Sequence, residues 1–323
     1  MLSRQCASVF GAKGPYLDRH DILFSSNVRW LDSSRHFAGS DEQFQRAANQ
    51  NNVVNRQRII DISGMYQTSR QDSMSVSIPI LAAGSWSIPR PTGPPAGTRF
   101  RQDSEGLSDI TMTYRHWVLD IDRAPKGNYA VGFGVKFPTG DPHAMDQFPD
   151  NNGQNIQDRP VDSSIQPGTG GWGIVFDFQS FKKVGAVTLF ASGTYLAEPK
   201  NVTGVARNST PSNTQYYSAP DQYLARIGGL TPIKAVKGLT LSIAARLEGV
   251  PPKDLIGGDD GFRRPGHALF IEPGLLWNRD RETWSLFGPV AIDRRRENNA
   301  FGQRGDATFA DYVLLFGYSY KLK

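Results

Sequence analysis

The chain lacks the long hydrophobic runs by which a helical membrane protein is recognised. No stretch of about 18 consecutive apolar residues occurs in its 323 residues. Its mean hydropathy is negative, as in most soluble proteins. These features exclude a bundle of transmembrane helices. They do not exclude a transmembrane β-barrel, because each barrel strand turns only alternate residues toward lipid.

Cysteine is almost absent, and neither sign of charge dominates. Cys6 is the only cysteine, which excludes an internal disulfide and a thiolate metal site. The 36 basic and 31 acidic residues leave a net charge of +5, and the basic residues are scattered among acids. We therefore expect no nucleic-acid partner. Residues 1–14 contain no apolar core of signal-peptide length, so we expect the signal peptide of an exported protein to be absent from the numbered chain.

The motifs of common enzymes are missing as well. No serine lies in a G-x-S-x-G motif, and Gly132-Phe133-Gly134 falls inside a strand pattern rather than before a helix, unlike a nucleotide-binding loop. Oxygen-rich loops at 150–158 and 257–261 lack the EF-hand spacing of a calcium site. We predict that the protein is not an enzyme and has no catalytic residues, metal or cofactor. The alternative is a barrel lipid hydrolase, for which His116 is the histidine most firmly held by a strand.

What the chain does have is a repeated alternation of apolar and other residues. It is clearest in residues 129–137, 239–247 and 312–320, where every second residue is apolar or aromatic. Successive strand residues point to opposite faces, so each stretch has one apolar face and one face richer in small or charged residues. The sequence contains twelve such candidate strands, near residues 19–32, 54–69, 72–86, 107–119, 127–138, 171–181, 184–197, 221–232, 237–249, 267–278, 282–293 and 309–322.

The connections between these strands alternate in length. Long polar connections (33–53, 87–106, 139–170, 198–220, 250–266 and 294–308) alternate with short ones, such as the turns at 69–71, 182–183 and 279–281. This alternation is typical of membrane barrels, which keep one rim tight and extend the other. We predict an all-β fold, a closed up-and-down antiparallel transmembrane barrel of about 12 strands with short periplasmic turns and long extracellular loops. Residues 19–323 would form the barrel, and residues 1–18 a periplasmic or plug segment.

The alternation also assigns side chains to the two faces of the barrel. We expect these residues to face lipid: Phe133, Val135, Phe176, Leu241, Ile243, Leu314 and Phe316. We expect these charged residues to line the lumen: Arg29, Asp61, Asp109, Arg115, Lys136, Asp177, Arg226, Arg246, Glu248 and Glu272. The lumen charges could line a solute pathway, or they could pair across a narrow lumen and fill it.

Two features fit the barrel less simply. Arg56 and Arg58 fall on the same side of their strand as apolar residues, and we expect them at the outer rim, where long basic side chains reach polar headgroups. Proline cannot donate to a strand ladder, and a closed barrel has no free edge to accommodate it. Pro79, Pro273 and Pro289 therefore require bulges, which the sequence does not locate.

Three short motifs resemble those of a known family. Gly106-Leu107-Ser108-Asp109 resembles a "GLGD" signature, residues 134–141 (GVKFPTGD) resemble a "GxKxPTGD" signature, and residues 167–170 (PGTG) resemble an "lGtG" element. These signatures are found in the bacterial outer-membrane proteins named after the meta-pathway of phenol degradation, which are described as transporters. The likeness extends over most of the chain, although its specific motifs lie within residues 106–172. It implies a barrel fold and an outer-membrane location.

The leading hypothesis is thus a multi-pass protein of the bacterial outer membrane that takes up small hydrophobic or aromatic solutes by passive diffusion along a lumen gated by the long loops, especially 139–170. Its expected partners are outer-membrane lipid, lipopolysaccharide and the solute, and no particular protein partner is indicated. One alternative is a non-conducting barrel that acts as an anchor or scaffold, its lumen blocked by residues 1–18 or by inward salt bridges. Another is a soluble β-sandwich or lipocalin-like carrier.

Overall fold

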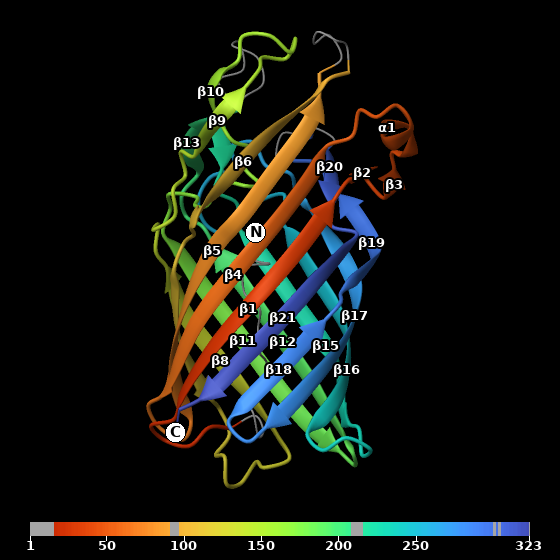
Figure 1. The fold of residues 1–323 in the computed structure, drawn as a ribbon. Coiled ribbons are helices and arrows are strands. Elements are labelled where there is room, and N and C mark those ends of the chain that lie inside the picture. The colour runs from red at the N-terminus through yellow and green to blue at the C-terminus, as the bar shows by residue number, and fades with distance from the viewer. Residues whose placement is uncertain (1–15, 91–96, 208–215, 300–301, 303–304, 323) are drawn as a thin grey trace.

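A computed structural model describes residues 16–90, 97–207, 216–299, 302 and 305–322. The described chain forms one tall, closed antiparallel β-barrel of twelve strand positions (Figure 1). The small amount of helix is the five-residue α1 (Phe44–Ala48). Among the described residues, no helix has the length and apolar character needed to cross a membrane. The predicted fold class is confirmed.

Consecutive barrel strands pair in the order of the chain, and β1 pairs with β21 to close the ring. This closure runs antiparallel from Leu23 opposite Lys321 to Asp32 opposite Tyr312. The strands are β1 (Ile22–Ser33), β4 (Val54–Gln67), β5 (Asp72–Pro89), β7 (Thr111–Trp117), β8 (Gly127–Lys136), β11 (Gly173–Val184), β12 (Val187–Ala197), β15 (Gln222–Pro232), β16 (Leu239–Val250), β17 (Gly266–Arg279), β18 (Glu282–Phe287) and β21 (Tyr312–Lys321).

Two of the twelve strand positions are interrupted. β6 (Arg99–Leu107) and β7 lie end to end along β5, and β18 and β19 (Val290–Arg296) lie end to end along β17. The first break falls at residues 108–110 and the second at 288–289. The sequence predicted single strands at 107–119 and 282–293, so both positions are longer than expected and broken.

The breaks explain the prolines that the sequence could not place. Pro79 in β5 lies opposite the first break, where the Ser108 N–H donates to its carbonyl oxygen (2.8 Å). Pro273 in β17 lies opposite the second break and accepts from the Gly288 N–H (3.0 Å), and Pro289 lies in that break. Pro79 and Pro273 each lie beside a neighbouring strand that is interrupted at that point. No carbonyl there requires a hydrogen bond from their missing N–H, so the proline costs the ladder no hydrogen bond.

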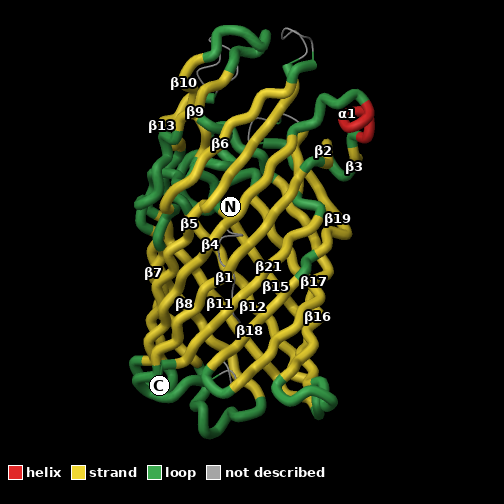
Figure 2. The backbone as a smooth tube through the Cα atoms, in the orientation of Figure 1, coloured by secondary structure: helices red, strands yellow, loops and turns green. Residues whose placement is uncertain are grey.

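Long and short connections lie at opposite ends of the barrel (Figures 1 and 2). The long ones carry a small sheet of β2 (Arg35–Ala38), β3 (Asp41–Glu42) and β20 (Asp306–Phe309), and two hairpins, β9 (Met145–Phe148) with β10 (Gln157–Pro160) and β13 (Val202–Ala206) with β14 (Tyr216–Ser218). The turn expected at 182–183 lies instead at 185–186. Lys182 and Lys183 continue the ladder with β12, and Gly185 has the positive φ of 59° that a two-residue hairpin favours.

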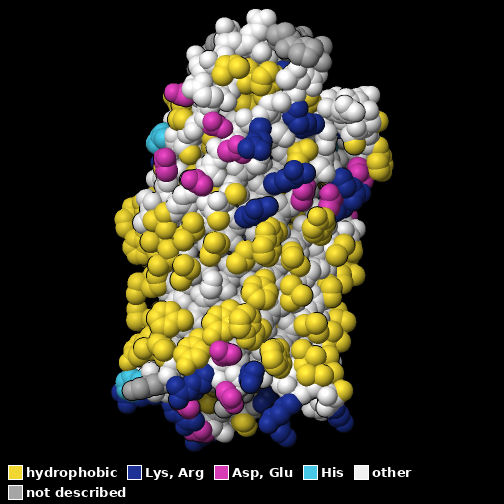
Figure 3. All heavy atoms as spheres, viewed as in Figure 1, with side chains coloured by type: hydrophobic (Ala, Val, Ile, Leu, Met, Phe, Trp, Pro, Cys, Tyr) yellow, Lys and Arg dark blue, Asp and Glu magenta, His cyan; other side chains and the backbone are white. Residues whose placement is uncertain are grey.

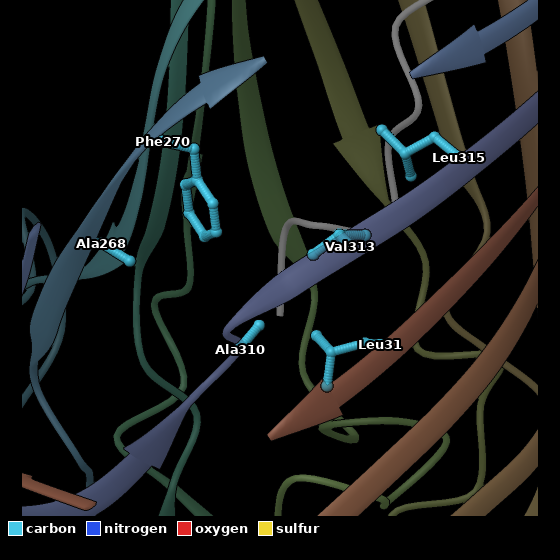
Figure 4. Close-up of a cluster of buried hydrophobic side chains, with 6 residues drawn as sticks. All are labelled: Leu31, Ala268, Phe270, Ala310, Val313 and Leu315. Atoms are coloured by element: carbon cyan, nitrogen blue, oxygen red, sulfur yellow. The ribbon is translucent and has the colours of Figure 1, made fainter. Parts of the chain in front are cut away.

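On the face shown in Figure 3, hydrophobic side chains cover a broad band of the outer wall, with charged side chains gathered above and below it. The interior also holds an apolar cluster. Six buried side chains from β1, β17, β21 and the residue that follows β20 (Asp306–Phe309) pack together there (Figure 4): Leu31, Ala268, Phe270, Ala310, Val313 and Leu315. The inner face at this side of the barrel is thus apolar.

Candidate functional site

The side chains predicted to face lipid lie on the exposed face of their strands. Phe133 is 54% exposed and Ile243 is 56% exposed, whereas Ala130 and Ala244 on the opposite faces of the same strands are buried. The Phe133 and Phe176 rings of neighbouring strands contact each other edge to face, with centroids 5.7 Å apart. Val135 and Leu241 are half-buried, and Phe176, Leu314 and Phe316 are exposed. Contact of these residues with lipid stays a prediction.

The ten charged residues predicted to line the lumen are buried or half-buried. Four of them form one continuous network on β15, β16 and β17. Glu272 pairs with Arg226 and, at 3.3 Å, with Arg246, which also binds Glu248 at 2.8 Å. The Arg226 guanidinium lies 5.5 Å from the centre of the Phe190 ring. The charges of these four residues, which lie on three different strands, thus neutralise one another.

The remaining predicted charges lie on other strands. Arg115 pairs with Asp177 at 2.7 Å, and Asp61 accepts a hydrogen bond of 2.8 Å from the Ser77 hydroxyl. Arg29 is 2% exposed. Removing a charge from such a buried arrangement leaves its partner without compensation, which is more costly than the pair itself is stabilising.

Lys136 and Asp109 belong to a second network near the long-loop end of the barrel, together with Thr169 and Glu198. The Lys136 Nζ lies 2.8 Å from Asp109 Oδ2, 2.9 Å from Glu198 Oε1 and 2.6 Å from Thr169 Oγ1. The Thr169 N–H also donates to Asp109 (3.1 Å). Outside the strands, burial raises the pKa of Glu198 to about 7, although Lys136 opposes the shift. Sequence reasoning missed Glu198, because it follows β12 in no recognisable motif.

The three family-like motifs therefore meet at one place. The strand break turns Asp109 inward, and Thr139 accepts from the Ile110 N–H and donates to the Ser108 carbonyl (both 2.9 Å). The backbones of Gly140 and Gly168 cross so closely that a Cβ on Gly140 would lie 2.8 Å from the Gly168 Cα. Only glycine fits this crossing. The motifs thus fix how the long connection 137–172 enters the barrel.

Part of that connection is folded into the barrel interior. Val161 and Ile165 have no exposed surface, and Ser164 is held by β4: Asn55 donates to its hydroxyl (2.6 Å) and Gln57 to its carbonyl (2.9 Å). The segment 160–168 is referred to below as the inward segment. It is the part of the predicted gating loop that reaches the interior of the barrel.

An ion pair attaches the inward segment to another long connection. The Arg264 guanidinium binds both carboxylate oxygens of Asp162, at 2.9 and 2.7 Å. Burial by itself would raise the pKa of Asp162. The Arg264 guanidinium and the hydrogen bonds from Ser164 lower this pKa by more than burial raises it, so the net shift is downward. Asp162 is therefore a buried carboxylate that stays charged at neutral pH. Sequence reasoning did not single out either partner.

Two cavities adjoin this ion pair. One is partly open and is lined largely by apolar and aromatic side chains, among them Trp86, Tyr223, Phe270 and Phe309. The other is bounded by the Lys136 network, Val175, Leu196 and Phe262. Both are lined by Ser164, Gln222, Val250 and Arg264. Apolar walls with a few fixed polar groups suit small, mainly apolar solutes.

The opposite end of the barrel contains an aromatic cluster. Tyr16 contacts Trp117 and Phe181 edge to face, with ring centroids 5.2 and 5.5 Å apart, and donates to the Ala124 carbonyl (2.9 Å). Tyr16 belongs to the segment 1–18 predicted as a plug, of which residues 1–15 lie outside the described part of the chain. The plug role stays a prediction.

Comparison with known proteins places the fold. No family model matches the sequence, and no curated protein matches it. The structure is similar to an outer membrane channel from Pseudomonas putida F1, with a TM-score of 0.63 and 11% sequence identity over 98% of this chain and 100% of that one. Weaker likenesses include a Pseudomonas aeruginosa FadL homologue (TM-score 0.45, 8% identity, 93% and 90% covered) and the Ralstonia pickettii toluene transporter TbuX (0.44, 8%, 95% and 90%).

At 11% identity, the likeness to the Pseudomonas putida channel shows a shared fold, that of an outer-membrane barrel. The relation to the phenol-degradation family stays a resemblance of motifs.

Proposed function

We propose that the protein is a channel of the bacterial outer membrane for the passive uptake of small hydrophobic or aromatic solutes, with its long loops outside the cell. One observation carries this proposal: two cavities with largely apolar walls adjoin each other inside the loop end of the barrel. Burial of apolar surface drives binding there, and the scarcity of free polar groups disfavours strongly hydrated solutes. The likeness of fold to an outer membrane channel supports the proposal.

In this mechanism, residues of the barrel and its loops bind the solute and control its passage, and they do not change it chemically. A solute enters between the long loops and occupies one cavity. To reach the other it must pass the side chains common to both linings, where the inward segment is tied to Arg264. Movement of this segment would therefore control passage. The paired charges on the strands, such as Glu272 with Arg226 and Arg246, would hold the wall in shape.

A second candidate is a non-conducting barrel that serves as an anchor or scaffold. It is favoured by the network of Arg226, Arg246, Glu248 and Glu272, which places bulky, mutually paired side chains in the interior. If these groups fill the lumen, solutes would enter the loop-end cavities and go no further.

Two measurements on the full chain separate the candidates. Single-channel recording in a planar bilayer tests for a continuous lumen, and quenching of tryptophan fluorescence by nitrobenzene, a small apolar aromatic that quenches indole by accepting an electron, tests for binding next to Trp86. The channel proposal expects both a conductance and quenching that is weakened by Trp86→Phe but not by Trp277→Phe, a residue 40% exposed on the wall. Quenching without conductance would favour the scaffold. Absence of both would refute the assignment of these solutes.

A further inference from the structure

The outer wall carries a groove just above the hydrophobic band. It is open to solvent and is formed by β1, β4, β5, β6 and β21. Ala83 and Ser85 provide small side chains between its two sides, and Trp30 and Tyr312 lie at its edge. The groove lies on the outside of the barrel and is distinct from the cavities described above.

Its position relative to the hydrophobic band follows from the register of the strands. Arg58 lies opposite Trp30 on one side and Ala83 on the other. Two residues further along the same face of β4 comes Ile60, followed by the exposed Ile62. On the face shown in Figure 3, dark-blue basic side chains gather directly above the yellow band. Aromatic and basic side chains at such a boundary are typical of the interface between hydrocarbon and polar headgroups.

Charges line the groove in two sets. On β4, the Arg56 side chain is 69% exposed and pairs with Asp32 at 2.9 Å, while Arg58 is exposed and makes no ion pair among the residues that the structure describes. On β6, Arg101 is paired with Asp103, and Glu105 is exposed. The wall on β4 thus offers two guanidinium groups next to the Asp32 carboxylate, and the wall on β6 offers the Arg101–Asp103 pair and the Glu105 carboxylate.

We infer that this groove binds the phosphorylated headgroup of lipopolysaccharide, with the acyl chains lying on the hydrophobic band below. Guanidinium groups bind phosphate through paired N–H donors, which assigns one lipid phosphate to Arg56 and Arg58. Asp103 and Glu105 would repel a phosphate directly, but carboxylates and phosphates share a divalent cation readily. A magnesium ion shared by Glu105, Asp103 and the lipid phosphate would offset this repulsion. The inference rests on the proposed outer-membrane location and not on an open lumen.

The test uses the full chain folded in detergent micelles and measures the binding of diphosphoryl lipid A by native mass spectrometry or calorimetry in the presence of magnesium. Arg56→Gln/Arg58→Gln is compared with Lys182→Gln/Lys183→Gln, which removes two exposed charges at the opposite, short-turn end. We expect the arginine variant to bind about tenfold more weakly and the lysine variant to bind as the wild type does. Asp103→Asn/Glu105→Gln is expected to remove the dependence of binding on magnesium.

Several results would overturn the inference. Equal binding by the wild type and the arginine variant would do so, as would equally tight binding of dephosphorylated lipid A, since the band alone would then explain the affinity. Displacement by millimolar inorganic phosphate would make the groove a site for free phosphate. If a magnesium chelator does not weaken the binding of lipid A, the proposed role of magnesium is refuted. An unchanged single-channel conductance in the arginine variant is expected, so failure here is distinguishable from failure of the channel proposal.

Discussion

The ion pair between Asp162 and Arg264 offers the sharpest test of gating by the inward segment. In Asp162→Asn, Arg264 loses its charged partner while it remains beside the two cavities. If the protein is the proposed channel and the inward segment limits passage, loosening this attachment should increase the time that the channel spends open. The two hydrogen bonds from Asn55 and Gln57 to Ser164 remain, so the segment is loosened and not released.

The expected magnitude follows from the burial of the pair. Removing one partner of a fully buried ion pair costs about 3–5 kcal/mol. The Arg264 side chain is 30% exposed and that of Asp162 only 4%, so water partly stabilises the remaining guanidinium, and we expect about 2 kcal/mol. A change of that size moves a two-state equilibrium by about thirtyfold.

The assay is single-channel recording with the open fraction as its readout. Asp162→Asn/Arg264→Gln also lacks the attachment but leaves no guanidinium without a partner, so its open fraction should lie between those of the wild type and Asp162→Asn. Asp122→Asn serves as a matched control, because it breaks an exposed pair with Arg70, where both side chains are more than half exposed. If Asp162→Asn folds normally, as judged by circular dichroism and heat-modifiable mobility, yet gates like the wild type, the reasoning is refuted.

Three further predictions concern the loop end and the opposite end. Because the folded-state pKa of Glu198 is about 7 and its ordinary value is 4.5, its contribution to stability is complete below about pH 4.5 and is lost as the pH rises through 7. The thermal midpoint should therefore decrease as the pH is raised from 5 to 8, and the decrease should be smaller in Glu198→Gln. An equal decrease in the variant would contradict this prediction. Gly168→Ala should lower the thermal midpoint, because its methyl group would overlap the backbone of Gly140, whereas Gly288→Ala, with open space around its Cβ, should change it much less. Tyr16→Ala removes the ring that packs on Trp117 and should raise conductance if that end is a constriction; equal conductance would exclude one there.

The fold could be predicted because two patterns in the sequence reflect the same physical constraint. Alternation such as that of residues 129–137 places a strand between two different environments, and alternating connection lengths specify the order in which strands pair. What the sequence could not give was the continuity of each strand. The breaks at 108–110 and 288–289 are specified by partners on the neighbouring strands, Pro79 and Pro273, and so by pairing that a linear pattern does not contain.

The candidate site was only partly visible in the sequence. Lys136 and Asp109 stood out because they occur in motifs, and the structure joins them in one network. Glu198 and Arg264 lie in connections whose shape depends on packing within the barrel, so neither periodicity nor spacing marks them. The inner apolar cluster was missed for another reason. Alternation placed Leu315 on the face opposite Phe316, and it is buried there, but we expected small or charged residues on that face and no apolar cluster.

The distribution of charge in the interior bears on how a barrel can admit apolar solutes. Unpaired lumen charges would hold water and ions, and would raise the cost of moving an apolar molecule past them. In this structure, Arg226, Arg246, Glu248 and Glu272 bind one another, whereas the cavity beside Phe270 has largely apolar walls. Pairing removes the net field of the charges. Substituting one member, as in Glu272→Gln, should therefore lower stability more than it changes ion selectivity, and the opposite result would identify these charges as the solute pathway itself.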